Sequence, residues 1–141
     1  MINFFKNNNK DKTNNDNSYY NIAALLIHAA KIDEDYSSDE QEIIKKTLLE
    51  IGASKENIDK IINNADEIEK NSNQILDFTQ EVKSMNNENK VLIVETLWRI
   101  IYSNKNADIY ETSLMRRLAG LLYIDSKIMG DIRDKIKKES L

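Results

Sequence analysis

Residues 19–32 read YYNIAALLIHAAKI, and this apolar stretch decides the fold. A helix drawn through it places apolar side chains on nearly every face between Ile22 and Ala30. Such a helix has to be enclosed by other helices, because a surface helix keeps one polar face. The apolar run is far shorter than the roughly 20 residues that cross a bilayer. The stretch therefore predicts the central helix of a soluble bundle.

Residues 88–103, ENKVLIVETLWRIIYS, form a second stretch of the same kind. Its apolar residues recur at intervals of three and four and occupy several helical faces, so it predicts a second central helix. The rest of the chain beyond residue 18 repeats this spacing without sustained alternation, and no strand is expected. We therefore predict an all-α bundle.

Capping sequences mark where the other helices begin. Ser37 followed by Glu40 has the Ser-x-x-Glu form of a capping box, and Gly52 is expected to end that helix. A shorter helical segment is expected from about residue 72 to residue 85. Similar caps are expected for three later helices, at Ser54, Asp108 and Asp125.

The two halves of the chain follow the same pattern. A shift of 71 positions, the separation of Ile22 from Ile93, aligns the central helices, the acidic loops and the outer helices. Glu40 then falls on Glu111. This internal repeat, over about residues 19–70 and 88–138, predicts two helical halves related by an approximate two-fold axis.

Composition limits the classes of function. The chain has 141 residues, no Cys and a formal net charge of -4, which excludes thiolate chemistry and gives no electrostatic reason to bind nucleic acid. The Asn- and Lys-rich residues 1–17 predict a flexible tail before a single domain at residues 18–141. The start of the chain lacks the features of a secretory signal, so we expect a cytoplasmic protein.

Two acidic loops are the candidate metal site. In the first loop, carboxylates gather near one helix N-terminus, where oxygen ligands suit Ca²⁺, Mg²⁺ or Mn²⁺. Both loops lack the Gly and the final Glu of an EF-hand. Helix capping explains the same acidic residues, and both interpretations stay open. The candidate metal ligands are Asp33, Asp35, Asp39 and Glu40 in the first loop and Asp108 and Glu111 in the second.

Catalytic motifs are absent from the sequence. There is no glycine-rich phosphate loop and no nucleophile motif, and His28 is the single histidine, so we expect no enzyme and give His28 no role. Arginine is favoured at protein interfaces, and Arg99, Arg116 and Arg117 are the candidate partner-binding residues. Trp98 is either part of this patch or, more commonly for such a residue, part of the core.

Three stretches together resemble a known family. They are Ala30-Lys31-Ile32-Asp33 followed by Glu40, LWRIIYSN at residues 97–104 followed by Glu111, and RRLAGLL at residues 116–122. Over about residues 19–138 the chain resembles the TerB family of tellurite-resistance proteins, most closely its uncharacterised bacterial branch. The resemblance implies about seven helices with pseudo-two-fold symmetry. It also implies a role in metal binding, through Asp33, Glu40 and Glu111, and in scaffolding stress-response complexes near the membrane.

The chain departs from the family pattern in both loops. Glu34 and Lys105 replace the Gly after each acidic position, and Asn104 replaces the second Asp, which removes one carboxylate. We expect a non-enzymatic TerB-like interaction module with an unidentified protein partner and weak divalent-cation binding at the first loop. The alternative is a metal-independent interaction domain like the TerB-like segment of membrane-anchored J-protein co-chaperones.

Overall fold

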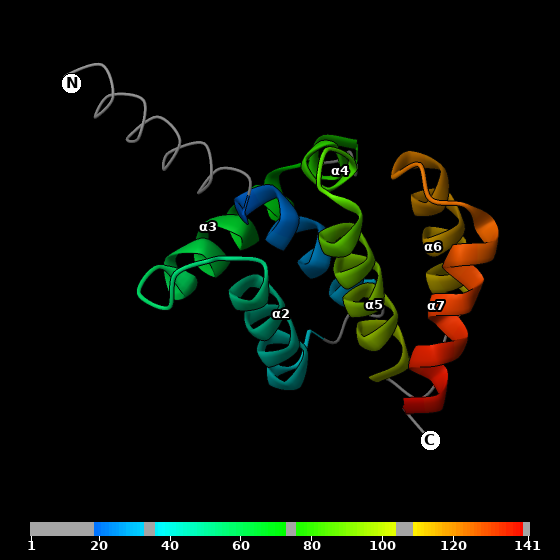
Figure 1. The fold of residues 1–141 in the computed structure, drawn as a ribbon. Helices are drawn as coiled ribbons and strands as arrows, with labels where there is room; N and C mark the ends of the chain where they lie inside the picture. The colour runs from blue at the N-terminus through cyan, green and yellow to red at the C-terminus, as the bar shows by residue number, and fades with distance from the viewer. Residues whose placement is uncertain (1–18, 33–35, 73–75, 104–108, 140–141) are drawn as a thin grey trace, which may run out of the picture.

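The structure, a computed structural model, describes residues 19–32, 36–72, 76–103 and 109–139, with the backbone alone for 109–112 (Figure 1). The predicted tail at residues 1–17 lies outside these ranges. The described residues form seven helical segments and no strand, which confirms the all-α prediction. Residues 19–31 are helical, and the other six are α2 (Ser38–Glu50), α3 (Ile58–Asn71), α4 (Leu76–Lys83), α5 (Asn87–Ser103), α6 (Ile109–Leu121) and α7 (Ser126–Glu139).

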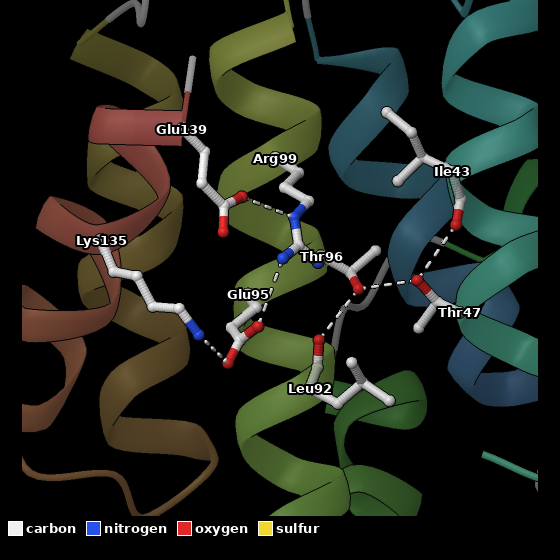
Figure 2. Close-up of polar contacts among 8 residues, drawn as sticks. All are labelled: Ile43, Thr47, Leu92, Glu95, Thr96, Arg99, Lys135 and Glu139. Carbon is white, nitrogen blue, oxygen red and sulfur yellow. Dashed lines mark hydrogen bonds and ion pairs between the residues drawn. The ribbon is translucent and has the colours of Figure 1, made fainter. Parts of the chain in front are cut away.

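The two apolar stretches form the centre of the bundle, as predicted. The segment 19–31 lies between α2 and α5 in both views (Figures 1 and 2), and α5 contacts α2, α4 and α7. Leu25, Leu26 and Leu97 have no exposed surface. Each fully buried side chain of this kind stabilises the fold by about 1.5–3 kcal/mol relative to an exposed one. None of the described helices has the length and apolarity to cross a membrane.

The predicted capping box begins α2. The Ser37 hydroxyl accepts a hydrogen bond from the Glu40 backbone N–H at 3.2 Å, and the Glu40 carboxylate accepts one from the Ser37 N–H at 3.0 Å. Asp125 caps α7 as predicted, since its carboxylate accepts a hydrogen bond from the Lys127 N–H at 2.8 Å. These contacts satisfy backbone donors that a helix leaves unpaired in its first turn.

Two boundaries differ from the sequence prediction. The α-helix expected after Ser54 begins only at Ile58, because a separate turn precedes it. In this turn the Ser54 hydroxyl accepts the Glu56 N–H and the Ser54 carbonyl accepts the Asn57 N–H. The segment expected to end near residue 85 ends at Lys83, and residues 73–75 in its expected first turn lie outside the described residues. The duplication of the two halves stays a prediction.

Gly52 ends α2 at a place where the chain packs closely. Its φ is +120°, a backbone conformation that L side chains rarely adopt. A Cβ at this position would lie 2.7 Å from the hydroxyl oxygen of Tyr19, which donates to the Ile51 carbonyl. The glycine is therefore required both by its backbone angle and by the first central segment.

Replacing Gly52→Ala should lower the free energy of unfolding by about 1–3 kcal/mol, because of the positive φ and the contact with Tyr19. In a Tyr19→Phe background the loss should be smaller, because the phenol oxygen is gone. Urea unfolding measures both. Gly120→Ala, in an open part of α6, is the matched control and should be neutral or slightly stabilising. An equal loss in both Tyr19 backgrounds would contradict the contact.

A buried pair of hydroxyls joins α2 to α5. The Thr47 and Thr96 oxygens lie 2.7 Å apart, and each also lies within 3.0 Å of the carbonyl one turn earlier in its own helix, those of Ile43 and Leu92 (Figure 2). The two hydroxyls have only two hydrogens for these three contacts. One threonine therefore donates to the other, and the second threonine donates to the carbonyl in its own helix. One hydrogen bond between the two hydroxyls therefore links the packed helices.

Thr47→Val and Thr96→Val should each lower the free energy of unfolding by about 1 kcal/mol, because valine keeps the shape and removes the hydroxyl. The double variant should lose less than the sum of the two, since either change alone breaks the shared hydrogen bond. Denaturant unfolding of all four proteins gives the coupling energy. Strict additivity would show that the two hydroxyls do not interact.

Candidate functional site

The structure places only part of the candidate metal site. Asp33, Asp35 and Asp108 lie outside the described residues, and the side chain of Glu111 is not described. Asp39 is exposed in the first turn of α2, and Glu40 is 1% exposed. Within the described ranges, no group of three or more His, Cys, Asp or Glu side chains is arranged to hold a metal ion. Metal binding at the acidic loops stays a prediction.

Glu40 has a structural role in the folded chain. One carboxylate oxygen accepts hydrogen bonds from both the backbone N–H and the hydroxyl of Ser37, each at 3.0 Å. The capping-box interpretation of this pair is therefore confirmed. An ion bound by Glu40 would have to share a carboxylate that already holds the start of α2.

A network of charged side chains joins the segment 19–31 to α3. The Lys31 ammonium donates to Asp66 at 2.7 Å and to Glu69 at 2.9 Å. His28 lies 3.3 Å from the other oxygen of Glu69, and Lys70 lies 3.2 Å from Asp66. The histidine to which the sequence assigned no role thus belongs to a contact between two helices.

Each side of the Lys31–Asp66 pair favours the charged form of the other. Burial raises the pKa of Asp66, but its hydrogen bonds with Lys31 and Lys70 outweigh this and leave that pKa below its ordinary value. Burial likewise lowers the pKa of Lys31, and the contacts with Asp66 and Glu69 overcome it and raise that pKa. Both groups are ionised at neutral pH.

Tyr36 follows the first acidic loop and has a buried hydroxyl. Burial raises the pKa of Tyr36 to about 12, and the carboxylates of Asp66 and Glu40 add to the effect. Within the described ranges its hydroxyl makes no hydrogen bond, and the Lys31 ammonium lies 6.0 Å from the centre of its ring. The phenol therefore stays neutral at physiological pH and is no source of negative charge for a cation.

Asp66→Asn should lower the free energy of unfolding at pH 7 by about 1 kcal/mol, the value typical of a partly exposed ion pair. Because the folded pKa of Asp66 lies below its ordinary 3.8, its stabilisation is present above that pH and lost as pH falls through the folded value. The difference between wild type and variant should therefore shrink as the pH falls below 3.8. Denaturant unfolding from pH 7 to pH 3 measures this.

Asp59→Asn provides the matched control for Asp66→Asn. Asp59 pairs with Lys45 at 3.4 Å, but its side chain is 80% exposed, so its removal should cost no more than a few tenths of a kcal/mol. A loss in Asp66→Asn that is the same at pH 3 and pH 7 would indicate lost packing and not a lost ion pair.

Arg99, a candidate partner-binding residue, is engaged inside the domain. Its guanidinium donates to Glu95 at 3.4 Å and to Glu139 at 3.2 Å (Figure 2). Lys135 contacts the other oxygen of Glu95 at 3.3 Å. These contacts join α7 to α5. The role that the structure gives Arg99 is therefore to stabilise the packing of two helices.

Arg116 and Arg117 are neighbours on α6, and both are exposed. Neither forms an ion pair with a carboxylate that the structure describes. They border different pockets: Arg117 lines one of about 460 Å³ together with His28, Ile32, Ser113 and Leu114. The three arginines predicted as one patch therefore have separate surroundings.

Arg116 borders a second pocket, of about 350 Å³, between α5, α6 and α7. Trp98 lines it and is 4% exposed, so the core interpretation of this residue is confirmed while its ring also forms one wall. The lining combines apolar side chains with two arginines and one hydroxyl: Trp98, Met115, Arg116, Ala119, Ser126, Met129, Gly130 and Arg133. We name this cavity the α5–α6–α7 pocket.

Sequence reasoning missed the α7 side of this pocket. The signal was present as spacing, since Ser126, Met129, Gly130 and Arg133 follow one another at intervals of three, one and three and share a helical face. Met115 and Ala119 are likewise one turn apart on α6. What the sequence did not show is that these two faces meet beside Trp98.

The fold and the site define an all-α bundle with cationic side chains at two surface pockets. The family model of tellurite resistance protein TerB matches residues 20–134. The chain therefore belongs to the TerB family. No curated protein and no solved structure gives a significant match to the chain.

Proposed function

We propose that this chain is a non-enzymatic interaction module of the TerB family that binds an acidic protein partner through Arg116 and Arg117. The observation that supports this most directly is the state of the two side chains. Both are exposed on one helix and neither is paired with a described carboxylate. Arginine recognises carboxylates with two parallel hydrogen bonds, which suits it to an acidic surface.

Arg116 and Arg117 differ in charge from the average surface of the protein. The protein as a whole has a net charge of -4, so an acidic partner gains nothing from the average surface. Arg99 differs from them, because its guanidinium forms ion pairs with two glutamates of the same chain. Arg116 and Arg117 keep their hydrogen-bond donors available, and a docking partner can use them without breaking an internal contact.

A bound cation is the alternative basis for the interaction. Glu40 is one of the candidate ligands for Ca²⁺, Mg²⁺ or Mn²⁺ at the first acidic loop, and its carboxylate already caps α2. The buried capping box favours a metal-independent module. Family membership supports a tellurite-resistance or stress-response setting for it.

Affinity capture followed by quantitative mass spectrometry tests the proposal. Wild-type protein should recover the same partner in EDTA and in millimolar Ca²⁺ or Mn²⁺. Arg116→Glu and Arg117→Glu should each reduce recovery at least about tenfold, because reversal of an interface charge costs on the order of 2 kcal/mol. Lys46→Glu, an exposed charge reversal on α2, is the matched control and should bind normally.

Two outcomes would contradict the proposal. Recovery that persists in both arginine variants would show that α6 is not the docking surface. Recovery that requires a divalent cation and is lost in Asp39→Ala would favour the acidic loop. Thermal unfolding of every variant, measured alongside, shows that a loss of capture is not a loss of folding.

A further inference from the structure

The α5–α6–α7 pocket differs from a packing defect in the chemistry of its lining. A void left between helices is usually lined by apolar atoms alone. This pocket has apolar walls from Trp98, Met115 and Met129, and it adds the guanidinium groups of Arg116 and Arg133. Its volume of about 350 Å³ lies within the range of sites that bind small molecules.

One buried polar group of a residue in the pocket wall has no described hydrogen-bond partner. The indole N–H of Trp98 is buried and makes no hydrogen bond to any described residue. The indole nitrogen is a donor only, and a buried donor without an acceptor costs about 1–3 kcal/mol. The signal of this N–H therefore reports on changes in the wall of the pocket.

The two guanidinium groups set the charge of that ligand. Arg116, on α6, has no described ion-pair partner. Arg133, on α7, has one among the described residues, Asp134, whose carboxylate lies 3.3 Å from its Nε. Both side chains are exposed at the pocket edge, and that single carboxylate leaves the pair with a net positive charge. An anion therefore fits the edge, whereas an apolar group fits the interior.

The sulfur-containing walls set the apolar part. Methionine side chains adapt to irregular shapes and make favourable contacts with aromatic rings. Met115 and Met129 lie beside Trp98, whose own ring is stacked on Tyr102 with 5.8 Å between centroids. A flat aromatic ring matches these walls better than a branched polar group does.

We infer that the α5–α6–α7 pocket binds a small aromatic carboxylate, with the ring against Trp98, Met115 and Met129 and the carboxylate between Arg116 and Arg133. This inference goes beyond the proposed function, and only Arg116 is common to the two.

The single tryptophan of the chain makes the test direct. Full-length protein is titrated with 4-phenylbutyrate while Trp98 fluorescence and the one indole N–H signal in a ¹H–¹⁵N spectrum are followed. Both should change with saturation at about millimolar concentration, as expected for a ligand of this size. N-acetyltryptophanamide corrects for quenching by the acid itself.

Two related compounds separate the parts of the ligand. The neutral isostere 4-phenylbutyramide tests the charge, and acetate tests the ring. Each should bind at least about tenfold more weakly than 4-phenylbutyrate. An equal response to acid and amide would overturn the inference, because the arginines would then have no role, and so would the absence of any saturable response.

Matched variants locate the site. Arg116→Gln and Arg133→Gln should each weaken 4-phenylbutyrate binding about tenfold, because each removes one charged hydrogen-bonding partner. Arg117→Gln, next to Arg116 on α6 but lining the other pocket, should bind normally. Equal weakening in Arg117→Gln would show a diffuse charge effect and overturn the assignment.

The experiment distinguishes this inference from the proposed function. If Arg116→Glu and Arg117→Glu both capture the protein partner normally while the wild-type protein binds 4-phenylbutyrate as expected, the docking surface is wrong and the pocket stands. If acid and amide bind equally while both arginine reversals abolish capture, the pocket assignment is wrong and the docking surface stands.

Discussion

Enclosure of two helices that are apolar on nearly all sides is the constraint on which the rest of the structure depends. The segment 19–31 and α5 have to be covered on every face, and α5 contacts α2, α4 and α7 in doing so. The helices that cover them need polar outer faces, so charged side chains lie on those faces and along the borders between neighbouring helices. The contacts between neighbouring helices are consequently where ion pairs and pockets form.

The charged side chains at the borders between helices are paired in some places and unpaired in others. Beside α3, Lys31 and Asp66 form a pair with Glu69 and Lys70 nearby, and beside α7, Arg99 and Lys135 are held by glutamates. These networks are largely neutral and join helices. At α6, Arg116 and Arg117 have no such described partner, and the apolar walls behind Arg116 enclose a pocket. Two adjacent arginines on one helix are therefore left without a described internal partner, and one of them borders that pocket.

The sequence predicted those features whose cause is local. Apolar periodicity located both central segments, and Ser37 with Glu40 predicted the capping box, because a helix start depends on residues three apart. Arg99 was assigned to a surface patch, and its engagement by Glu139 depends on how α5 meets α7. The pocket beside Trp98 was missed for the same reason, since its walls come from three helices far apart in sequence. Contacts between helices are set by packing, which one sequence does not show.

Glu40 shows why a family motif does not by itself identify a site. The spacing from Asp33 to Glu40 is part of the TerB resemblance, and metal binding is one explanation of it. In the folded chain Glu40 is buried and completes the cap of α2. A helix that covers the core needs that cap whether or not an ion binds, so the motif residue has a sufficient structural reason. The functional argument is stronger at the α5–α6–α7 pocket, where Arg116 on α6 and the Trp98 indole N–H on α5 have no described partner that would explain them structurally.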